Sequence, residues 1–434
     1  MKTSRYNLYL SDHTGMVIYN ARADEVIVLN PQLAGLFEEG KDNPELIRQQ
    51  HPDLLTFLIE KGVFVENDMD EIADYINARK QADEESGEFT ITVNPTLACN
   101  MKCWYCYENH KNMPTMKAEV KQSVIALVNK VASSGRYSQL YLSFFGGEPL
   151  LCFDTVVSDL LKAAKSACMN NDVTLYVHFT TNAYLLSTEM LDQMKGMNIS
   201  FQITIDGNEH VHNGVRITKN GNPTYATIVK NIQTAISWGF SVGVRFNYTY
   251  QSLPSFIDVL EEFKNLDPER KRLLKFNFQR VWQDHDGRIE EVERLVSEME
   301  YAFEKAGLWI NHANNYYIPY CYADKANSAV VNYNGDIFKC TARDFNTKSR
   351  EGTLSFDGEI CWNDRHRKRL SVMNGIPFCL KCKIYPICHG GCSQMKLEST
   401  TTDSCPKGYT SKRVTEIMEG RAMFLLGRFR NKNI

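Results

Sequence analysis

The chain has 434 residues, more than one hydrophobic core usually organises, which predicts roughly two to three domains. Its charges nearly balance, with a formal net charge of -3, so the composition does not favour a nucleic-acid partner. The first residues lack the apolar core of a secretion signal, and no later stretch is long enough to span a membrane. We therefore expect a cytoplasmic protein that binds neither nucleic acid nor membrane.

Thirteen cysteines are the unusual feature of this composition. The cytoplasm keeps thiols reduced, so metal ligation or redox chemistry explains them better than a disulfide framework.

The N-terminal region, residues 1–85, has the pattern of a small α+β module. Two β-branched runs at 16–19 and 26–29 and a third at 62–65 predict short strands around helical segments. The polar, acidic segment 72–88 predicts a solvated helix and linker, with the domain boundary within 81–87.

The middle region, residues 86–312, alternates between apolar segments and helix-period segments. The predicted strands are 89–93, 140–145, 174–179, 200–205, 242–248 and 274–281. The predicted helices between them are 118–132, 155–167, 188–194, 225–238 and 256–263. This alternation predicts an α/β fold, a partial (β/α)6 TIM-like barrel with its active site at the carboxyl ends of the strands.

The last region, residues 313–434, loses this rhythm and is rich in cysteine, so we expect bound metal to organise its fold. Its tail, 414–430, predicts an amphipathic helix that packs as a cap.

The first cysteine cluster directly follows the first predicted barrel strand. Cys99, Cys103 and Cys106 have the spacing C-x3-C-x2-C. Three thiolates on a four-iron cluster leave one iron free to bind a small molecule. Zinc is the alternative, and His110 is the one fourth ligand that the neighbouring sequence offers.

This loop, with the aromatic Tyr105 before its last cysteine, resembles that of the radical S-adenosylmethionine (SAM) superfamily. The resemblance continues after the next three strands in the segments FGGEP, TTN and ITIDGNEHVHNGVR, the last of which holds an H-x3-R pattern. It implies that Gly146, Gly147 and Glu148 hold the amino group of the methionine moiety, with Tyr105, Thr181, Asn182, Thr204, Asp206 and Arg216 forming the rest of the cofactor pocket.

The resemblance also implies the chemistry. A reduced 4Fe–4S cluster passes one electron to the sulfonium of SAM, and the resulting 5′-deoxyadenosyl radical removes a hydrogen atom from the substrate. The protein holds the cofactor on the open iron and excludes water.

Seven further cysteines resemble the SPASM domain, the auxiliary-cluster module of enzymes that modify peptides and proteins. This resemblance implies two more 4Fe–4S clusters, three in total. The nearer would be held by Cys321, Cys340 and Cys392, and the farther by Cys379, Cys382, Cys388 and Cys405. Some relatives supply a further ligand to the nearer cluster where this chain has Asn327, so that cluster has an open iron or is closed by Cys361.

Other residues keep more ordinary interpretations. Cys152 and Cys168 lie in helical context and are expected to be buried apolar residues, and His389 is expected to pack or to donate to a cluster sulfur. The basic run 365–369 is expected to be a solvated helix face. Trp282, Asp284 and Asp286 either line the substrate cavity or cap it.

Two substrate classes fit these resemblances. Sulfatase-maturing enzymes share the architecture, but they commonly carry an aspartate after the second SPASM cysteine, where this chain has Thr341. The N-terminal module looks like the winged-helix element that binds leader peptides by strand addition.

We therefore expect a maturase that crosslinks a ribosomally made peptide through a thioether or carbon-carbon bond. Its expected partners are a precursor peptide with a leader sequence and an electron donor such as flavodoxin or ferredoxin. The alternatives are a sulfatase-type maturase that oxidises a cysteine or serine to formylglycine, and a non-catalytic zinc-binding scaffold.

Overall fold

The structure is a computed structural model that describes residues 1–108, 114–312, 320–399 and 401–432, without the side chains of 428–432. The chain forms two compact units. The barrel unit consists of residues 86–313 and 327–366, and the terminal unit of residues 1–85, 314–326 and 367–434. We describe each unit by itself.

Six parallel strands form the centre of the barrel unit. Each pairs with the next in the order β6 (Glu88–Val93), β8 (Gln139–Phe144), β9 (Thr174–Thr181), β10 (Asn198–Ile205), β12 (Ser241–Tyr248) and β13 (Leu274–Arg280). These are the six strands that the sequence predicted, and the predicted α/β fold with a partial TIM-like barrel is confirmed.

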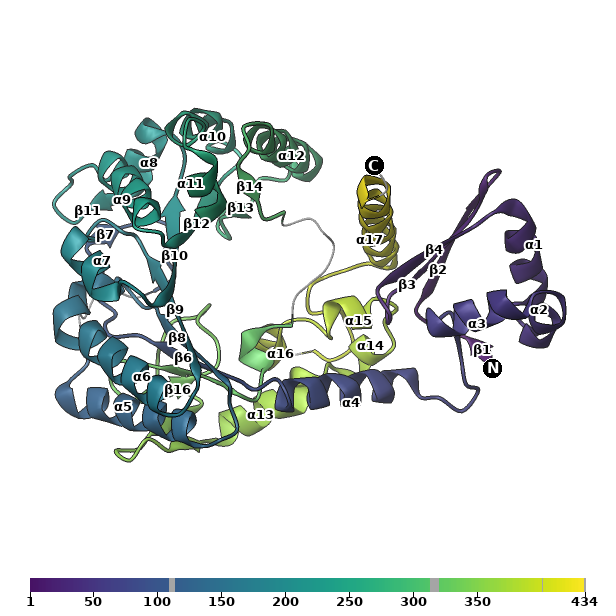
Figure 1. The fold of residues 1–434 in the computed structure, drawn as a ribbon, viewed down its shortest axis with the longest axis horizontal. Coiled ribbons are helices and arrows are strands. Elements are labelled where there is room, and N and C mark those ends of the chain that lie inside the picture. Colours follow the sequence, from purple (N-terminus) through teal and green to yellow (C-terminus); the bar gives the residue numbers. More distant parts are fainter. Residues whose placement is uncertain (109–113, 313–319, 400, 433–434) are drawn as a thin grey trace. The chain divides into compact units, whose positions relative to one another are not determined.

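Helices surround the outside of these strands, as Figure 1 shows. The helices are α5 (Ala118–Ser133), α6 (Ser158–Asn170), α7 (Thr188–Met194), α8 (Glu209–Val215), α9 (Tyr225–Ser237), α10 (Phe256–Val259), α11 (Pro268–Leu273) and α12 (Ile289–Lys305). Alternation along β12 explains the arrangement, since Val244 and Phe246 are fully buried while Arg245 and Asn247 are only half-buried and face the inside. The strands therefore present polar side chains to the lumen and apolar ones to the helices.

The barrel sheet continues beyond the six predicted strands on both sides. A short strand, β14 (Trp309–Ile310), pairs with β13, and β15 (Ser328–Val331) pairs in parallel with β6. Three antiparallel strands, β16 (Asp336–Phe338), β17 (Gly352–Leu354) and β18 (Ile360–Trp362), follow it. The alternation of helix and strand therefore ends after residue 313 as predicted, although the sequence did not predict the four strands within 328–362.

The predicted division into residues 1–85, 86–312 and 313–434 differs from the two units. The first boundary coincides with the end of a segment of the terminal unit at Glu85. Residues 327–366 cluster with the barrel, while 367–434 cluster with the N-terminal region. The second predicted boundary adjoins residues 313–319, which lie outside the described residues.

The N-terminal part of the terminal unit is an antiparallel sheet covered by three helices. The strands are β2 (Asn7–Asp12), β3 (Gly15–Asn20) and β4 (Glu25–Leu29), followed by α1 (Pro31–Gly40), α2 (Pro44–Gln50) and α3 (Pro52–Glu60). Each helix has proline at its start, and the side chain of Asn30 caps α1 by accepting from the Leu33 amide. A two-stranded pair, β1 (Lys2–Thr3) with β5 (Phe64–Val65), completes this part. The sequence predicted β3, β4 and β5 but missed β1 and β2.

Other side chains of the N-terminal part share a core with the C-terminal residues. Tyr6 and Tyr19 are buried with Tyr385 and with Met418 of α17 (Ser411–Lys432). Nε of Arg421 on α17 also donates to Asp24 Oδ1 at 2.9 Å. The predicted capping helix therefore packs as expected, and the two ends of the chain fold as one unit.

The predicted polar helix forms as α4 (Glu71–Glu84), and Glu84 and Glu85 are exposed as expected, while the first half of the helix is packed and hydrogen-bonded. The Tyr75 hydroxyl donates to the Pro386 carbonyl at 2.9 Å and lies 2.7 Å from Nδ1 of His389. The rings of Tyr75 and His389 are stacked. The buried Glu71 carboxylate accepts from the Arg5 amide at 3.0 Å. The role expected for His389, packing, is confirmed.

A further correction concerns the basic run on α13 (Asp364–Met373). Arg369 is buried rather than solvated, and its guanidinium donates to Ser393 Oγ at 2.6 Å and to Gln394 Oε1. These hydrogen bonds compensate the guanidinium for the water that it loses on burial. Cys152 and Cys168 are buried in the barrel core, as predicted.

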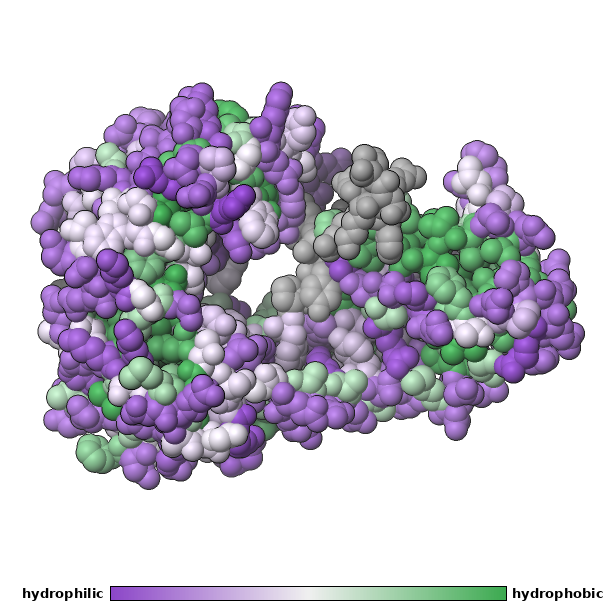
Figure 2. Space-filling view, in the orientation of Figure 1, coloured by the Kyte–Doolittle hydropathy of each residue, from purple (hydrophilic) through white to green (hydrophobic). Residues whose placement is uncertain are grey.

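The outer helices of the barrel unit present mainly hydrophilic residues (Figure 2). Among the described helices, none combines the length and apolar character needed to cross a membrane.

Candidate active site

The loop after β6 places its three cysteines around one cavity. Cys99, Cys103 and Cys106 all line a cavity of about 210 Å³ at the carboxyl ends of the parallel strands. The loop is held by β7 (Met101–Lys102), which pairs with β11 (Ile217–Thr218). This pairing fixes the cysteine loop beside the segment that carries Arg216.

The second loop, after β8, approaches the cysteine loop so closely that only glycine fits. A Cβ atom on Gly147 would lie 2.1 Å from the Ala98 carbonyl oxygen, and one on Gly146, whose φ is +104°, would lie 2.4 Å from that of Thr96. The Glu148 amide donates to the Ala98 carbonyl at 2.8 Å. The glycines thus let two backbones meet at the edge of the cavity.

Glu148 is fully buried behind these glycines and links two strand ends. Its carboxylate accepts from Thr181 Oγ1 at 2.6 Å and from the Asn182 amide at 2.7 Å. Burial raises the pKa of this carboxyl, while these hydrogen bonds lower it. Asn182 Nδ2 donates to Asn100 Oδ1 at 2.7 Å and lies 3.9 Å from Cys99 Sγ. A chain of polar contacts therefore connects β9 to the cysteine loop.

Arg216 and Asp206 form a buried pair on the opposite side. Arg216 Nη1 lies 3.5 Å from Cys103 Sγ, and its Nε lies 3.4 Å from Asp206 Oδ2. The Tyr105 hydroxyl donates to Asp206 Oδ2 at 2.8 Å and accepts from Asn247 Nδ2 at 3.1 Å. Burial raises the pKa of Asp206 to about 6, although the Arg216 charge lowers it. The cation beside Cys103 is therefore held in place by the network around Asp206.

His212, the histidine of the H-x3-R pattern, is buried behind this pair. Its Nδ1 lies 3.3 Å from the Asp206 amide, and its Nε2 lies 3.1 Å from Thr224 Oγ1. Thr224 in turn donates to the Arg216 carbonyl. Burial, and secondarily Arg216, lowers the pKa of His212 to about 3, so the ring is neutral and positions the backbone at both ends of the pattern.

Most of the residues named from the sequence line this one cavity, namely Cys99, Cys103, Tyr105, Cys106, Gly146, Gly147, Thr181, Asn182, Thr204 and Arg216. Glu148 and Asp206 are buried behind it and hold its walls. Sequence reasoning missed Gln202, Arg245 and Asn247, which face the lumen from β10 and β12. The alternation of polar and apolar residues along the predicted strands could have indicated these three residues.

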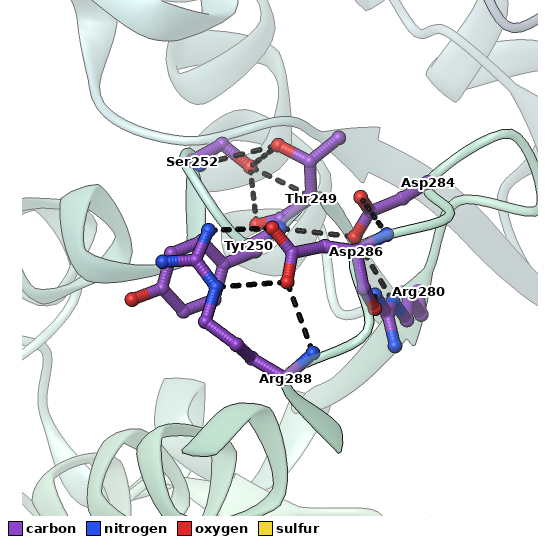
Figure 3. Close-up of polar contacts among 7 residues, drawn as sticks. All are labelled: Thr249, Tyr250, Ser252, Arg280, Asp284, Asp286 and Arg288. Carbon is purple, nitrogen blue, oxygen red and sulfur yellow. Dashed lines mark hydrogen bonds and ion pairs between the residues drawn. The ribbon is translucent and has the colours of Figure 1, made fainter. Parts of the chain in front are cut away.

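The rim of the cavity is anchored by a polar network around the end of β13 (Figure 3). Arg280 Nε donates to Asp284 Oδ2 at 2.9 Å, and the same oxygen accepts from the Tyr250 amide at 3.0 Å. Asp286 pairs with Arg288, which lowers the pKa of Asp286 to about 2. Trp282 lines the cavity, while Asp284 and Asp286 are absent from its lining and brace the loop.

Four of the C-terminal cysteines surround a second cavity, of about 470 Å³, within the terminal unit. Its lining includes Cys379, Cys382, Cys388 and Cys405. The backbone there turns tightly, since His389 has a φ of 55° and a Cβ atom on Gly390 would lie 2.9 Å from Gly375 Cα. The four cysteines are those that the SPASM resemblance assigns to one cluster.

The remaining predicted ligands divide between the units. Cys321 and Cys392 belong to the terminal unit, and Cys340 belongs to the barrel unit. Their grouping stays a prediction.

The sheet register separates Cys361 from Cys340. Cys361 pairs with Thr353, which pairs with Asp336, and Cys340 lies four residues further along than Asp336. Cys340 itself lies beyond the end of β16, so the closing of the nearer cluster by Cys361 stays a prediction.

The thiols around both cavities suit metal ligation better than free thiolate chemistry. Burial raises the pKa of Cys99 to about 12 and also raises the pKa values of Cys103, Cys379 and Cys388. A thiol of this kind loses its proton when a metal ion binds to the sulfur. Within the described part of the chain, no three histidine, cysteine or acidic side chains are close enough to hold a single metal ion. His110 lies outside the described residues.

Comparison with known proteins identifies part of the chain. Residues 93–261 match the model of the radical SAM superfamily. An uncharacterized protein of Methanocaldococcus jannaschii is 27% identical over 58% of this chain and 84% of its own length. An Fe-coproporphyrin III synthase of Methanosarcina barkeri is 28% identical over 40% of this chain. A serine-type anaerobic sulfatase-maturating enzyme of Bacteroides thetaiotaomicron is 25% identical over 41%. The chain spans only 41% and 44% of the latter two relatives.

Two solved structures share the fold over most of the chain. The anSMEcpe protein with bound AdoMet has a TM-score of 0.61 at 17% identity, covering 80% of this chain and 100% of that one. SuiB of Streptococcus suis, bound to S-adenosylmethionine, has a TM-score of 0.54 at 16% identity, covering 93% and 98%. SuiB has also been crystallised with its precursor peptide SuiA, and that structure has a TM-score of 0.51.

Proposed function

Residues 93–261 form a radical SAM domain, and from this premise we propose that the protein is a maturase that crosslinks a ribosomally synthesised peptide. The crosslink is a thioether or carbon-carbon bond. The observation that carries the proposal is the fold shared with SuiB over 93% of this chain, since SuiB binds a precursor peptide.

A radical SAM domain implies S-adenosylmethionine and a 4Fe–4S cluster. Cys99, Cys103 and Cys106 would hold the cluster through three of its irons, which leaves the fourth for the cofactor. The close backbone approach at Gly146 and Gly147 suits a cradle for the methionine amino group. The Arg216 cation, which the Asp206 network holds beside Cys103, suits a contact to the cofactor's carboxylate.

When bound, the reduced cluster and cofactor supply a radical that removes a hydrogen atom from the substrate. The chain's own contribution is positioning. Glu148 ties the cysteine loop to β9 through Thr181 and Asn182, and Tyr105 ties it to β12 through Asn247. These buried links keep the cavity walls rigid, so that the substrate meets the cofactor in one orientation.

Two auxiliary 4Fe–4S clusters would receive the second electron that crosslinking removes from the peptide. Cys379, Cys382, Cys388 and Cys405 supply four thiols around one cavity, enough to close a cluster. Cys321, Cys340 and Cys392 would hold the other. A reduced flavodoxin or ferredoxin would supply electrons.

The N-terminal sheet would recognise the leader of the precursor peptide. Its strand order, β2-β3-β4, leaves β2 at an edge, where an added strand can form main-chain hydrogen bonds. The module looks like a winged-helix recognition element in its short strands and covering helices.

The test is anaerobic purification followed by reaction. We expect brown protein with about twelve irons per chain and release of 5′-deoxyadenosine when SAM and dithionite are added. Co-expression with a short peptide encoded nearby should yield peptide lighter by two hydrogen atoms, with the bond located by tandem mass spectrometry. Colourless protein that contains only zinc would contradict the proposal and favour the non-catalytic scaffold.

A sulfatase-type maturase is the second candidate, favoured by the fold shared with anSMEcpe and by the Bacteroides relative. Thr341 argues against it, because it replaces the aspartate that commonly follows the second SPASM cysteine in such enzymes. Hydrazine capture of an aldehyde on a cysteine- or serine-containing peptide would decide for this candidate.

A further inference from the structure

Three arginines line the cavity of the barrel unit, and two of them are paired with an acid. Arg216 lies 3.4 Å from Asp206, and Arg280 donates to Asp284 at 2.9 Å. Figure 3 shows that Arg280 also turns toward the loop that follows β13, where it donates to the Asp286 carbonyl. Each of these two cations therefore has an acid of the protein within ion-pair distance.

Arg245 differs from these two arginines. Its Nε donates to the neutral amide of Asn247 at 2.8 Å, and no ion pair joins it to an acid in the described part of the chain. Glu108 is the acidic residue of the described cavity lining. Asp206, buried behind the cavity, acts on Arg245 electrostatically but is paired with Arg216. The segments outside the described residues, 109–113 and 313–319, contain no aspartate or glutamate.

The guanidinium of Arg245 is also held in a fixed direction. Asn247, which accepts from its Nε, donates from Nδ2 to the Tyr105 hydroxyl at 3.1 Å, and Tyr105 is anchored on Asp206. This leaves the two terminal nitrogens of Arg245 as a planar fork inside the cavity. Such a fork matches the two oxygens of a carboxylate.

We propose that Arg245 is the anion-binding subsite of the substrate cavity and that it receives a carboxylate of the peptide, from an acidic side chain or from a free C-terminus. The proposal deepens the proposed function and rests on it. Burial lowers the pKa of Arg245, and the charges of Asp206 and of the two neighbouring tyrosines only partly offset this effect. An incoming carboxylate would offset it further.

The rim of the same cavity suits a peptide. Tyr107 and Trp282 stack with ring centroids 5.7 Å apart, and they are 38% and 58% exposed. Exposed, ordered aromatic rings provide a large contact area for a bound side chain at low entropic cost. The cavity therefore combines an aromatic entrance with one arginine that makes no ion pair in the described part of the chain.

The test uses three ¹⁴C-acetylated tripeptides and the reconstituted holoenzyme with saturating SAM, in anaerobic equilibrium dialysis. The probes are Ac-Ala-Glu-Ala-NH₂, Ac-Ala-Gln-Ala-NH₂ and Ac-Ala-Gln-Ala-OH. The glutamate probe tests a side-chain carboxylate, the last tests a C-terminal one, and the glutamine amide is neutral. The proteins are wild type, Arg245→Gln and, as a charge-matched control, Arg272→Gln, whose side chain is exposed on α11.

We expect the wild type to bind at least one carboxylate probe about tenfold more tightly than the neutral probe, as a charged hydrogen-bonded pair provides. Arg245→Gln should abolish this preference, and Arg272→Gln should keep it. The subsite is rejected if the wild type has no preference or if Arg245→Gln retains it. The subsite is also rejected if Arg245→Gln weakens SAM binding more than tenfold while the preference for the carboxylate probes stays the same. Deoxyadenosine release by the wild type, measured separately, tests the proposed function itself.

Discussion

The two cysteine-lined cavities differ in the number of thiols and in what surrounds them. The barrel cavity has three cysteines on one loop, and the rest of its wall mixes polar groups from successive strand ends with apolar residues such as Phe145 and Trp282. The cavity of the terminal unit has four cysteines, apolar residues such as Phe378 and Ile384, and three lysines, Lys381, Lys383 and Lys407. Three thiols leave a four-iron cluster one free coordination position and four leave none, so the first cavity suits ligand binding and the second electron transfer.

The largest effect should come from removing the three-thiol set. We expect the Cys99→Ala, Cys103→Ala, Cys106→Ala variant to lose about four irons and all detectable deoxyadenosine release. Cys168→Ala is the matched control, because it removes a buried cysteine of the barrel core and should keep both. Full turnover in the triple variant would show that the three-cysteine cavity is not the site of SAM cleavage.

Removing thiols from the four-cysteine cavity should have a more selective effect. The Cys379→Ala, Cys405→Ala variant should also lose about four irons and stop crosslinking the peptide. Deoxyadenosine release without peptide should stay within about tenfold of wild type, because the cavity that carries it is in the other unit. Loss of both reactions, with the helical circular dichroism retained, would show that the two cavities are not functionally separate.

The close approach of two backbone segments at Gly147 is a further feature of the barrel cavity. In Gly147→Ala the new methyl group would meet the Ala98 carbonyl at 2.1 Å, so the two loops must move apart. We expect SAM affinity to fall by about tenfold to a hundredfold in equilibrium binding. Gly214→Ala on α8, where a Cβ atom meets nothing within 4 Å, should bind SAM normally.

The smallest expected effect concerns the buried His212 behind the barrel cavity. Its pKa is lowered from 6.5 to about 3 in the folded chain, so between these values the unfolded chain binds the extra proton. The free energy of unfolding should therefore fall as pH decreases below about 6.5, by up to about 1.4 kcal/mol per pH unit from this group. Urea unfolding at pH 7.5 and 6.0 should show a smaller loss for His212→Gln than for wild type. Equal losses would mean that His212 is accessible to protons.

The barrel and its motif residues could be predicted because their signals are local. Three cysteines within one loop and the glycines before Glu148 are neighbours in sequence, and each follows a recognisable strand. Arg245 was missed because a polar residue in a strand gains meaning only when its neighbours are known. In the sheet it stands beside Thr204, which lines the same cavity.

The packing of the terminal unit could not be predicted, although several of its elements were, because its contacts are distant in sequence. Tyr75 bonds to Pro386 and His389, and Asp24 pairs with Arg421, so no local pattern reveals the partners. The polarity of α4 predicted a helix but not its packing, because the few apolar contacts that pack it depend on those partners.

The pairing of β15 with β6 has a consequence for synthesis of the protein. Val93, at the end of the first barrel strand, pairs with Val331. At typical ribosomal rates the residues between them take on the order of tens of seconds to make. Throughout that time the outer edge of an apolar strand has no partner, which exposes the nascent chain to aggregation. Slow translation at low temperature and chaperone co-expression should therefore raise the yield of folded enzyme more than stabilising the finished barrel would.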